Sequence, residues 1–89
     1  MIEQEITIVN KLGLHARAAA KFVQLAGRFR AHIRLSRDGQ TVDGKSILGI
    51  LTLAACKGTS LLLRVDGPDE SEAVDALTTL IDDKFGEGQ

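Results

Sequence analysis

The sequence has few aromatic residues, and this scarcity excludes several kinds of ligand recognition. Its 89 residues include three Phe and neither Tyr nor Trp. Proteins that bind single-stranded nucleic acid stack its bases on aromatic side chains, so we expect no nucleic-acid partner. The sequence also lacks a Walker-type phosphate-binding loop, which indicates that the protein does not bind ATP itself and carries no cofactor.

Cysteine and long apolar runs are equally scarce. The single Cys56 cannot form an internal disulfide, and its position among small apolar residues predicts that it is buried. One cysteine and two distant histidines, His15 and His32, give no metal-ligand spacing, so we expect no metal site. No run of about 18 apolar residues could span a membrane, and the acidic N-terminus is unlike a signal peptide. We therefore expect a cytoplasmic protein that does not insert into a membrane.

The length predicts one domain, residues 1–89, that acts as a monomer. Its formal net charge of −1 conceals a division of charge along the chain. Residues 1–37 hold seven basic and two acidic side chains, whereas residues 38–89 hold four basic and ten acidic ones. This asymmetry has two interpretations: a basic docking face for acidic partners, or a fold that interleaves the two halves and cancels the difference.

Hydrophobic periodicity predicts four strands and three helices. Alternation of period two predicts strands over residues 2–9, 31–36, 40–43 and 60–66. Apolar residues at helical spacing predict helices over residues 16–26, 47–56 and 69–85. The order β-α-β-β-α-β-α is typical of an α+β open-faced sandwich, in which a four-stranded antiparallel sheet carries three helices on one face.

Local signals mark the boundaries of these elements. Asp38-Gly39 predicts a tight antiparallel hairpin between the second and third strands. Asp69 and Glu72 have the spacing of a capping box at the start of the last helix. The tail Glu87-Gly88-Gln89 is predicted to be frayed.

The segment Gly13-Leu14-His15-Ala16-Arg17 stands where the first helix begins. No Ser, Thr, Asp or Asn lies between Lys11 and this helix, so its first backbone N–H groups lack the usual side-chain acceptor. The free amides of Ala16 and Arg17 at the positive end of a helix favour phosphate, and the Arg17 guanidinium can fork onto phosphate oxygens. A neutral His15 ring there is a nucleophile. The segment predicts a phosphoryl acceptor, with a plain surface histidine as the alternative.

The second predicted helix begins after Ser46, which is explained by itself as a favoured N-cap residue. This helix is apolar nearly all round, and a short helix turns only about half its circumference to the core. Some apolar side chains must therefore be exposed, where they form a docking patch, unless they pack against the first helix.

Two motifs carry a resemblance to a known family. Asn10-Lys11-Leu12-Gly13-Leu14-His15-Ala16-Arg17 and Gly44-Lys45-Ser46-Ile47, together with the element order, resemble the histidine-containing phosphocarrier (HPr) family of the bacterial phosphoenolpyruvate-dependent phosphotransferase system. The resemblance runs almost end to end. It implies that His15 accepts a phosphoryl group on Nδ1 from Enzyme I and passes it to EIIA proteins during sugar transport, assisted by Arg17.

The same resemblance implies further roles. Ser46 is expected to be phosphorylated by an HPr kinase/phosphorylase, and Ile47, Leu48 and Leu51 are expected to contact partner proteins. The protein would be a relay without a substrate pocket of its own. A nucleic-acid module built on the basic half competes with this interpretation but leaves His15 unexplained.

One residue departs from the family pattern. Ala18 stands where the family usually has proline, and alanine is an excellent helix former, so the change alters local stiffness and leaves the phosphate chemistry intact. The segments 53–59 and 66–68 are similar to the nitrogen-branch paralogue NPr, which acts mainly as a phosphorylation-dependent regulator. That paralogue remains the alternative, whereas the setting of Ser46 favours the sugar-branch carrier.

Overall fold

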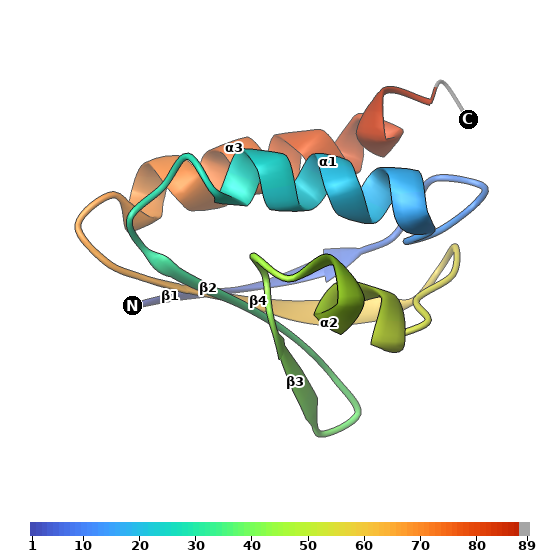
Figure 1. The fold of residues 1–89 in the computed structure, drawn as a ribbon, viewed down its shortest axis with the longest axis horizontal. Helices are drawn as coiled ribbons and strands as arrows, with labels where there is room; N and C mark the ends of the chain where they lie inside the picture. The colour runs from blue at the N-terminus through green and yellow to red at the C-terminus, as the bar shows by residue number, and fades with distance from the viewer. Residues whose placement is uncertain (88–89) are drawn as a thin grey trace.

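The computed structural model describes residues 1–87, which form a four-stranded sheet with helices over one face (Figure 1). Along the chain the elements are β1 (Ile2–Thr7), α1 (Ala16–Ala26), β2 (His32–Arg37), β3 (Gln40–Asp43), α2 (Ile47–Thr52), β4 (Ser60–Asp66), α3 (Glu70–Asp82) and the 3-10 turn η1 (Lys84–Gly86). The strands lie in the order β1-β4-β2-β3, and all neighbours are antiparallel. The predicted open-faced sandwich is confirmed.

The core lies between the sheet and the helices. Alternate residues of β2 and β4 point into it, and Phe22 of α1 is completely buried against them. Complete burial of such a side chain contributes about 2 kcal/mol. The buried alanines of α1, Ala18, Ala19 and Ala26, let this helix pack closely beside α3 and over the sheet. Within residues 1–87 no helix is long and apolar enough to cross a membrane.

The β2–β3 hairpin turns at the predicted dipeptide. Asp38 has φ 49° and Gly39 has φ 84°, so both turn residues adopt the left-handed conformation that matches the twist of the two strands. Ser36 and Thr41 face each other across the hairpin, and their hydroxyl oxygens lie 2.9 Å apart.

The helix predicted over residues 47–56 is shorter than expected, because α2 ends at Thr52. The chain leaves the helix at Ala54, which has a left-handed φ of 50°. The Arg37 guanidinium donates hydrogen bonds to the backbone oxygens of Leu53 and Ala54, at 2.7 and 3.0 Å. These bonds satisfy carbonyl groups that a longer helix would have used. Cys56, predicted to be buried, is exposed in the loop that follows.

The predicted capping box of α3 is also wrong. Asp69 occupies the N-cap position but makes no side-chain cap. Its carboxylate accepts hydrogen bonds from the backbone N–H groups of Arg30 and Ala31, at 2.8 and 3.0 Å, so it serves the start of β2 instead. Glu70 reaches back to the backbone N–H of Gly67 at 3.1 Å. At the other end, Phe85 is buried as predicted but lies in η1, beyond α3.

Candidate functional site

Two loops meet at the end of the molecule where α1 begins. The backbone N–H of Leu14 donates to the oxygen of Ala55 at 2.8 Å, which joins the loop before α1 to the loop after α2. Gly13 permits this approach: its φ is +69°, and a Cβ there would lie 2.6 Å from the oxygen of Ala55 and 2.8 Å from Cα of Cys56. The close packing fixes the backbone just before His15.

His15 occupies the N-cap position of α1 without capping it. Its backbone is extended, with φ −77° and ψ 177°, and its side chain makes no cap hydrogen bond. Within residues 1–87 the backbone N–H groups of Ala16 and Arg17 have no acceptor, whereas that of Ala19 donates to the oxygen of His15 at 2.9 Å. The bare helix start expected from the sequence is present. Its positive end faces the half-exposed imidazole, whose side chain is 29% accessible.

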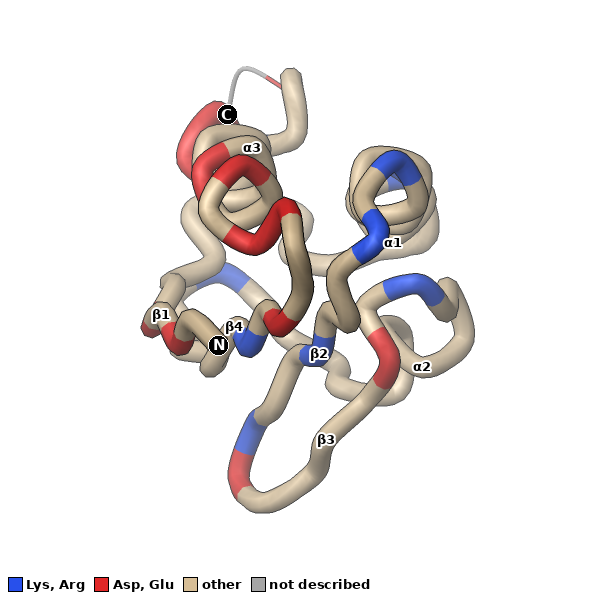
Figure 2. The backbone as a smooth tube through the Cα atoms, turned by 90° about the vertical axis from the view of Figure 1, so that its left-hand side faces the viewer, with Lys and Arg blue, Asp and Glu red and all other residues tan. Residues whose placement is uncertain are grey.

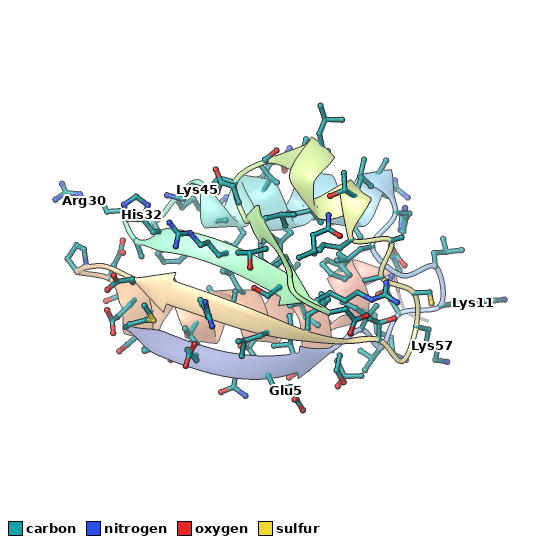
Figure 3. All side chains as sticks on the ribbon, turned by 90° about the horizontal axis from the view of Figure 1, so that it is seen from below. Glu5, Lys11, Arg30, His32, Lys45 and Lys57 are labelled. Atoms are coloured by element: carbon teal, nitrogen blue, oxygen red, sulfur yellow. The ribbon has the colours of Figure 1, made fainter. Side chains whose placement is uncertain are left out.

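Positive side chains surround this end of the fold. Arg17 is exposed on the first turn of α1 and forms no ion pair with any residue from 1 to 87. Lys11 and Lys57 project from the two joined loops at the same edge of the molecule, as Figure 3 shows. Such an arrangement attracts anionic groups and acidic surfaces.

The charge division of the sequence survives in part in the fold. The basic residues of α1 and the acidic residues of α3 lie on two neighbouring helices, as Figure 2 shows. Helix α3 carries Glu70, Glu72, Asp75 and Asp82 without a basic residue. The sheet interleaves charges, because Glu3 of β1 pairs with Arg64 of β4 at 2.7 Å. The fold therefore keeps the division of charge between α1 and α3 and interleaves it in the sheet, whereas docking at the basic face stays a prediction.

Glu87 is the residue of this site that the sequence analysis missed. Its carboxylate lies 2.5 Å from Nε2 of His15 and accepts a second hydrogen bond from Nδ2 of Asn10 at 3.1 Å. The prediction that Glu87 is frayed was wrong, and residues 88 and 89 lie outside the described residues. The hydrogen bond from His15, more than any other influence, lowers the pKa of the Glu87 carboxyl, and Asn10 and the charge of Lys21 lower it further.

The structure places Ser46 at the start of α2, where its hydroxyl oxygen accepts a hydrogen bond from the backbone N–H of Gly49 at 3.1 Å. The next two side chains point outward: Ile47 is 41% and Leu48 is 78% accessible. Leu51 is half-buried against the core, and Ile50 is fully buried. The helix that carries these exposed apolar groups, α2, packs against α1.

Other candidates lie away from this arrangement. His32 is exposed, as predicted, and Figure 3 shows it at the opposite end of the molecule from Lys11 and Lys57. Among residues 1–87 the hydrogen bonds of Cys56 are all to Thr59, whose hydroxyl oxygen accepts from the Cys56 backbone N–H at 3.2 Å and lies 3.7 Å from its sulfur.

Comparison with known proteins gives the family. The sequence model described as "PTS HPr component phosphorylation site" matches residues 2–83. The chain belongs to the PTS HPr family. It is 55% identical to the phosphocarrier protein HPr of Cupriavidus necator over 89 residues, with both chains fully covered. It is thus similar to HPr phosphocarriers of the phosphotransferase system along its whole length.

Solved HPr structures share the fold. The crystal structure of HPr-C-His from Thermoanaerobacter tengcongensis is 48% identical, with a TM-score of 0.94 and coverage of 98% of both chains. A structure described as the HPr dimer of the same organism, also 48% identical, gives a TM-score of 0.79 and covers 98% of this chain and 100% of that one. As an HPr family member the chain is a phosphocarrier with partners in the phosphotransferase system, and the NPr alternative is not favoured.

Proposed function

We propose that His15 is the phosphoryl acceptor of this chain, which takes the group from phospho-Enzyme I and delivers it to an EIIA protein. The observation that carries the proposal is the bare N-terminus of α1, where His15 holds the N-cap position and leaves two backbone amides free. An N-cap Ser or Asp would occupy one amide of this first turn with its own side-chain oxygen.

Phosphoryl transfer needs a nucleophile and hydrogen-bond donors that stabilise the negative charge of the phosphoryl oxygens. The lone pair on Nδ1 of His15 attacks phosphorus, the new N–P bond forms as the bond to the donor histidine breaks, and that electron pair returns to the donor nitrogen. The phosphoryl oxygens keep their negative charge throughout. We assign the backbone N–H groups of Ala16 and Arg17, with the Arg17 guanidinium, to hold these oxygens. No metal or cofactor is required by this step.

Partner proteins would dock around the same end of the molecule. The exposed side chains of Ile47 and Leu48, with the half-buried Leu51, offer an apolar surface on α2, the helix that packs against α1 with its exposed Arg17. An apolar patch with a basic border suits an acidic partner surface that must bind and then release quickly. We propose that the chain serves these partners in the cytoplasm as a monomer.

Phosphorylation of Ser46 would regulate phosphoryl transfer. A phosphate on its hydroxyl would stand at a helix start, where the dipole stabilises negative charge, so the fold would tolerate it. The added charge would lie next to the apolar docking surface and repel an acidic partner. We propose that an HPr kinase/phosphorylase, where one is present, uses this site to reduce transfer.

The decisive experiment measures phosphoryl transfer directly. The protein is incubated with phosphoenolpyruvate, Enzyme I and magnesium, and its mass is recorded. We expect the mass gain of one phosphoryl group, labile in acid and stable in base, and absent from His15→Ala. If the unchanged protein gains no mass, or the variant gains it equally, His15 is not the acceptor.

A further inference from the structure

Glu87, near the end of the described residues, forms a hydrogen bond with the imidazole of His15. One carboxylate oxygen of Glu87 lies 2.5 Å from Nε2 of His15, and the Glu87 side chain is only 12% accessible. A carboxylate cannot donate, so Nε2 must carry the proton of this hydrogen bond. Within residues 1–87, Nδ1 has no hydrogen-bond partner.

The carboxylate is held in place from two sides. Asn10, which is completely buried, donates one hydrogen bond from Nδ2 to the second oxygen of Glu87 and another to the backbone oxygen of Gly13 at 2.8 Å. Lys21 of α1 donates from Nζ to the backbone oxygen of Phe85 at 2.6 Å, and the Phe85 ring is buried. The turn that carries Glu87 is therefore fastened to α1 and to the loop before it.

We propose that Glu87 is the positioning residue of the phosphoryl acceptor: it selects the His15 tautomer with the proton on Nε2 and the lone pair on Nδ1, and it orients the ring. The inference rests on the proposed function. A neutral imidazole in solution exchanges its proton between both nitrogens, and only the form with a free Nδ1 can attack phosphorus from that atom. A fixed carboxylate on Nε2 keeps the ring in the reactive form, as the buried aspartate does in serine protease triads.

The same carboxylate acts during the transfer itself. When Nδ1 bonds to phosphorus, the ring acquires positive charge that is shared with the protonated Nε2. Glu87 faces that charge directly, whereas Arg17 and Lys21 of α1 supply only positive charge near the ring. Stabilisation of a charge that develops during reaction lowers the barrier.

The first test reads the tautomer. The full-length protein is labelled with nitrogen-15, and the Nδ1 and Nε2 signals of His15 are recorded by NMR at a mildly alkaline pH. We expect one tautomer, protonated at Nε2, in the unchanged protein. Glutamine can both donate to and accept from Nε2, so in Glu87→Gln both tautomers should be populated. Glu72→Gln removes the same charge at the other end of α3 and should leave the signals unaltered.

The second test measures transfer from phospho-Enzyme I. Glu87→Gln should lower kcat about tenfold, the low end of the cost of losing a charge-assisted hydrogen bond, and leave KM unchanged because docking is untouched. Glu87→Asp should restore part of the rate by restoring the charge. Glu72→Gln should transfer at the full rate. Melting curves establish that each variant is folded, and Asn10→Ser provides a second way to loosen Glu87.

The outcomes separate the inference from the function on which it rests. If the unchanged protein accepts no phosphoryl group, the proposed function fails. If it accepts the group but folded Glu87→Gln shows either an unaltered tautomer or an unaltered rate, the function stands and the role of Glu87 is overturned. If Glu87→Gln does not fold, Asn10→Ser decides the matter by the same two readouts.

Discussion

Single residues decide whether the start of a helix is closed or open. Ser46 accepts a hydrogen bond from the third amide of α2, that of Gly49, whereas the side chain of His15, at the same position on α1, caps no amide. The two positions are equivalent in backbone geometry, since both residues are extended. The N-cap side chain therefore determines whether the third amide of the first turn has an intramolecular acceptor.

Substitution of Ser46 separates its structural role from the regulatory role proposed for it. Ser46→Ala removes the acceptor for the Gly49 amide and should lower the free energy of unfolding by about 1 kcal/mol, measured by urea denaturation. Ser46→Asp keeps an N-cap acceptor and should retain stability, but its charge should slow phosphoryl transfer from Enzyme I about tenfold. Equal transfer rates for Ser46→Asp and the unchanged protein would argue against control at this site.

At the level of elements, the end of α2 shows how a neighbouring strand sets a helix boundary. Arg37 of β2 donates to two carbonyl groups at the end of α2, and Ala54 accepts a left-handed conformation there. A residue with a Cβ atom destabilises the fold by roughly 1 kcal/mol when it adopts that conformation. The strain is local, and the Ala54 methyl group is exposed.

Replacement of Ala54 by glycine should therefore stabilise the fold. Glycine adopts a φ of 50° without a steric penalty, and the gain should reach about 0.5 kcal/mol after the greater freedom of the unfolded chain is deducted. The matched change Ala20→Gly in the interior of α1 should do the opposite and cost about 1 kcal/mol. Denaturant titration of both variants measures the difference, and a destabilised Ala54→Gly contradicts the explanation.

The sequence predicted elements well where the signal is local. The alternation in β4, the stripe around Phe22 in α1 and the dipeptide Asp38-Gly39 each depend on neighbours in sequence, and all three were confirmed. The end of α2 and the capping box of α3 were predicted wrongly, because Arg37 and Asp69 act on segments distant in sequence. Hydrophobic periodicity does not indicate a hydrogen bond between segments that are distant in sequence.

For the candidate site the same limit applies. His15 and its bare helix start follow from consecutive residues, so sequence reasoning could find them. Glu87 lies 72 positions further along the chain, and only the packing of Phe85 and the bond from Lys21 bring its carboxylate to the imidazole. The residues around Glu87 in the sequence do not indicate that its carboxylate lies beside the His15 imidazole.

At the scale of the whole molecule, Asp69 joins the beginning of α3 to the beginning of β2. Its carboxylate accepts hydrogen bonds from two backbone N–H groups, those of Arg30 and Ala31. The bond from Arg30 is the strongest reason that the pKa of Asp69 lies below its ordinary value, and the bond from Ala31 and the charge of Lys45 act in the same direction. The ionised carboxylate therefore contributes to the stability of the entire fold.

The contribution of Asp69 should depend on pH with a definite sign. A carboxyl group whose pKa is lowered by folding stabilises the protein above the unfolded value of 3.8, and this stabilisation is lost as the pH falls through the lower folded value. Asp69→Asn should be less stable than the unchanged protein at pH 7, and the difference should shrink below pH 3.8. Urea unfolding across this range measures it. Asp75→Asn, an exposed change on the same helix, should show no such convergence.

The two ends of the described chain lie on opposite sides of the molecule, with unequal consequences for laboratory handling. The amino group of Met1 pairs with Glu70 at 3.1 Å, far from α1's first turn, and exposed ion pairs of this kind are worth little. Glu87, at the other end of the described residues, contacts the imidazole of His15. An affinity tag or fluorophore is therefore best attached at the amino end, away from the contact between Glu87 and the His15 imidazole.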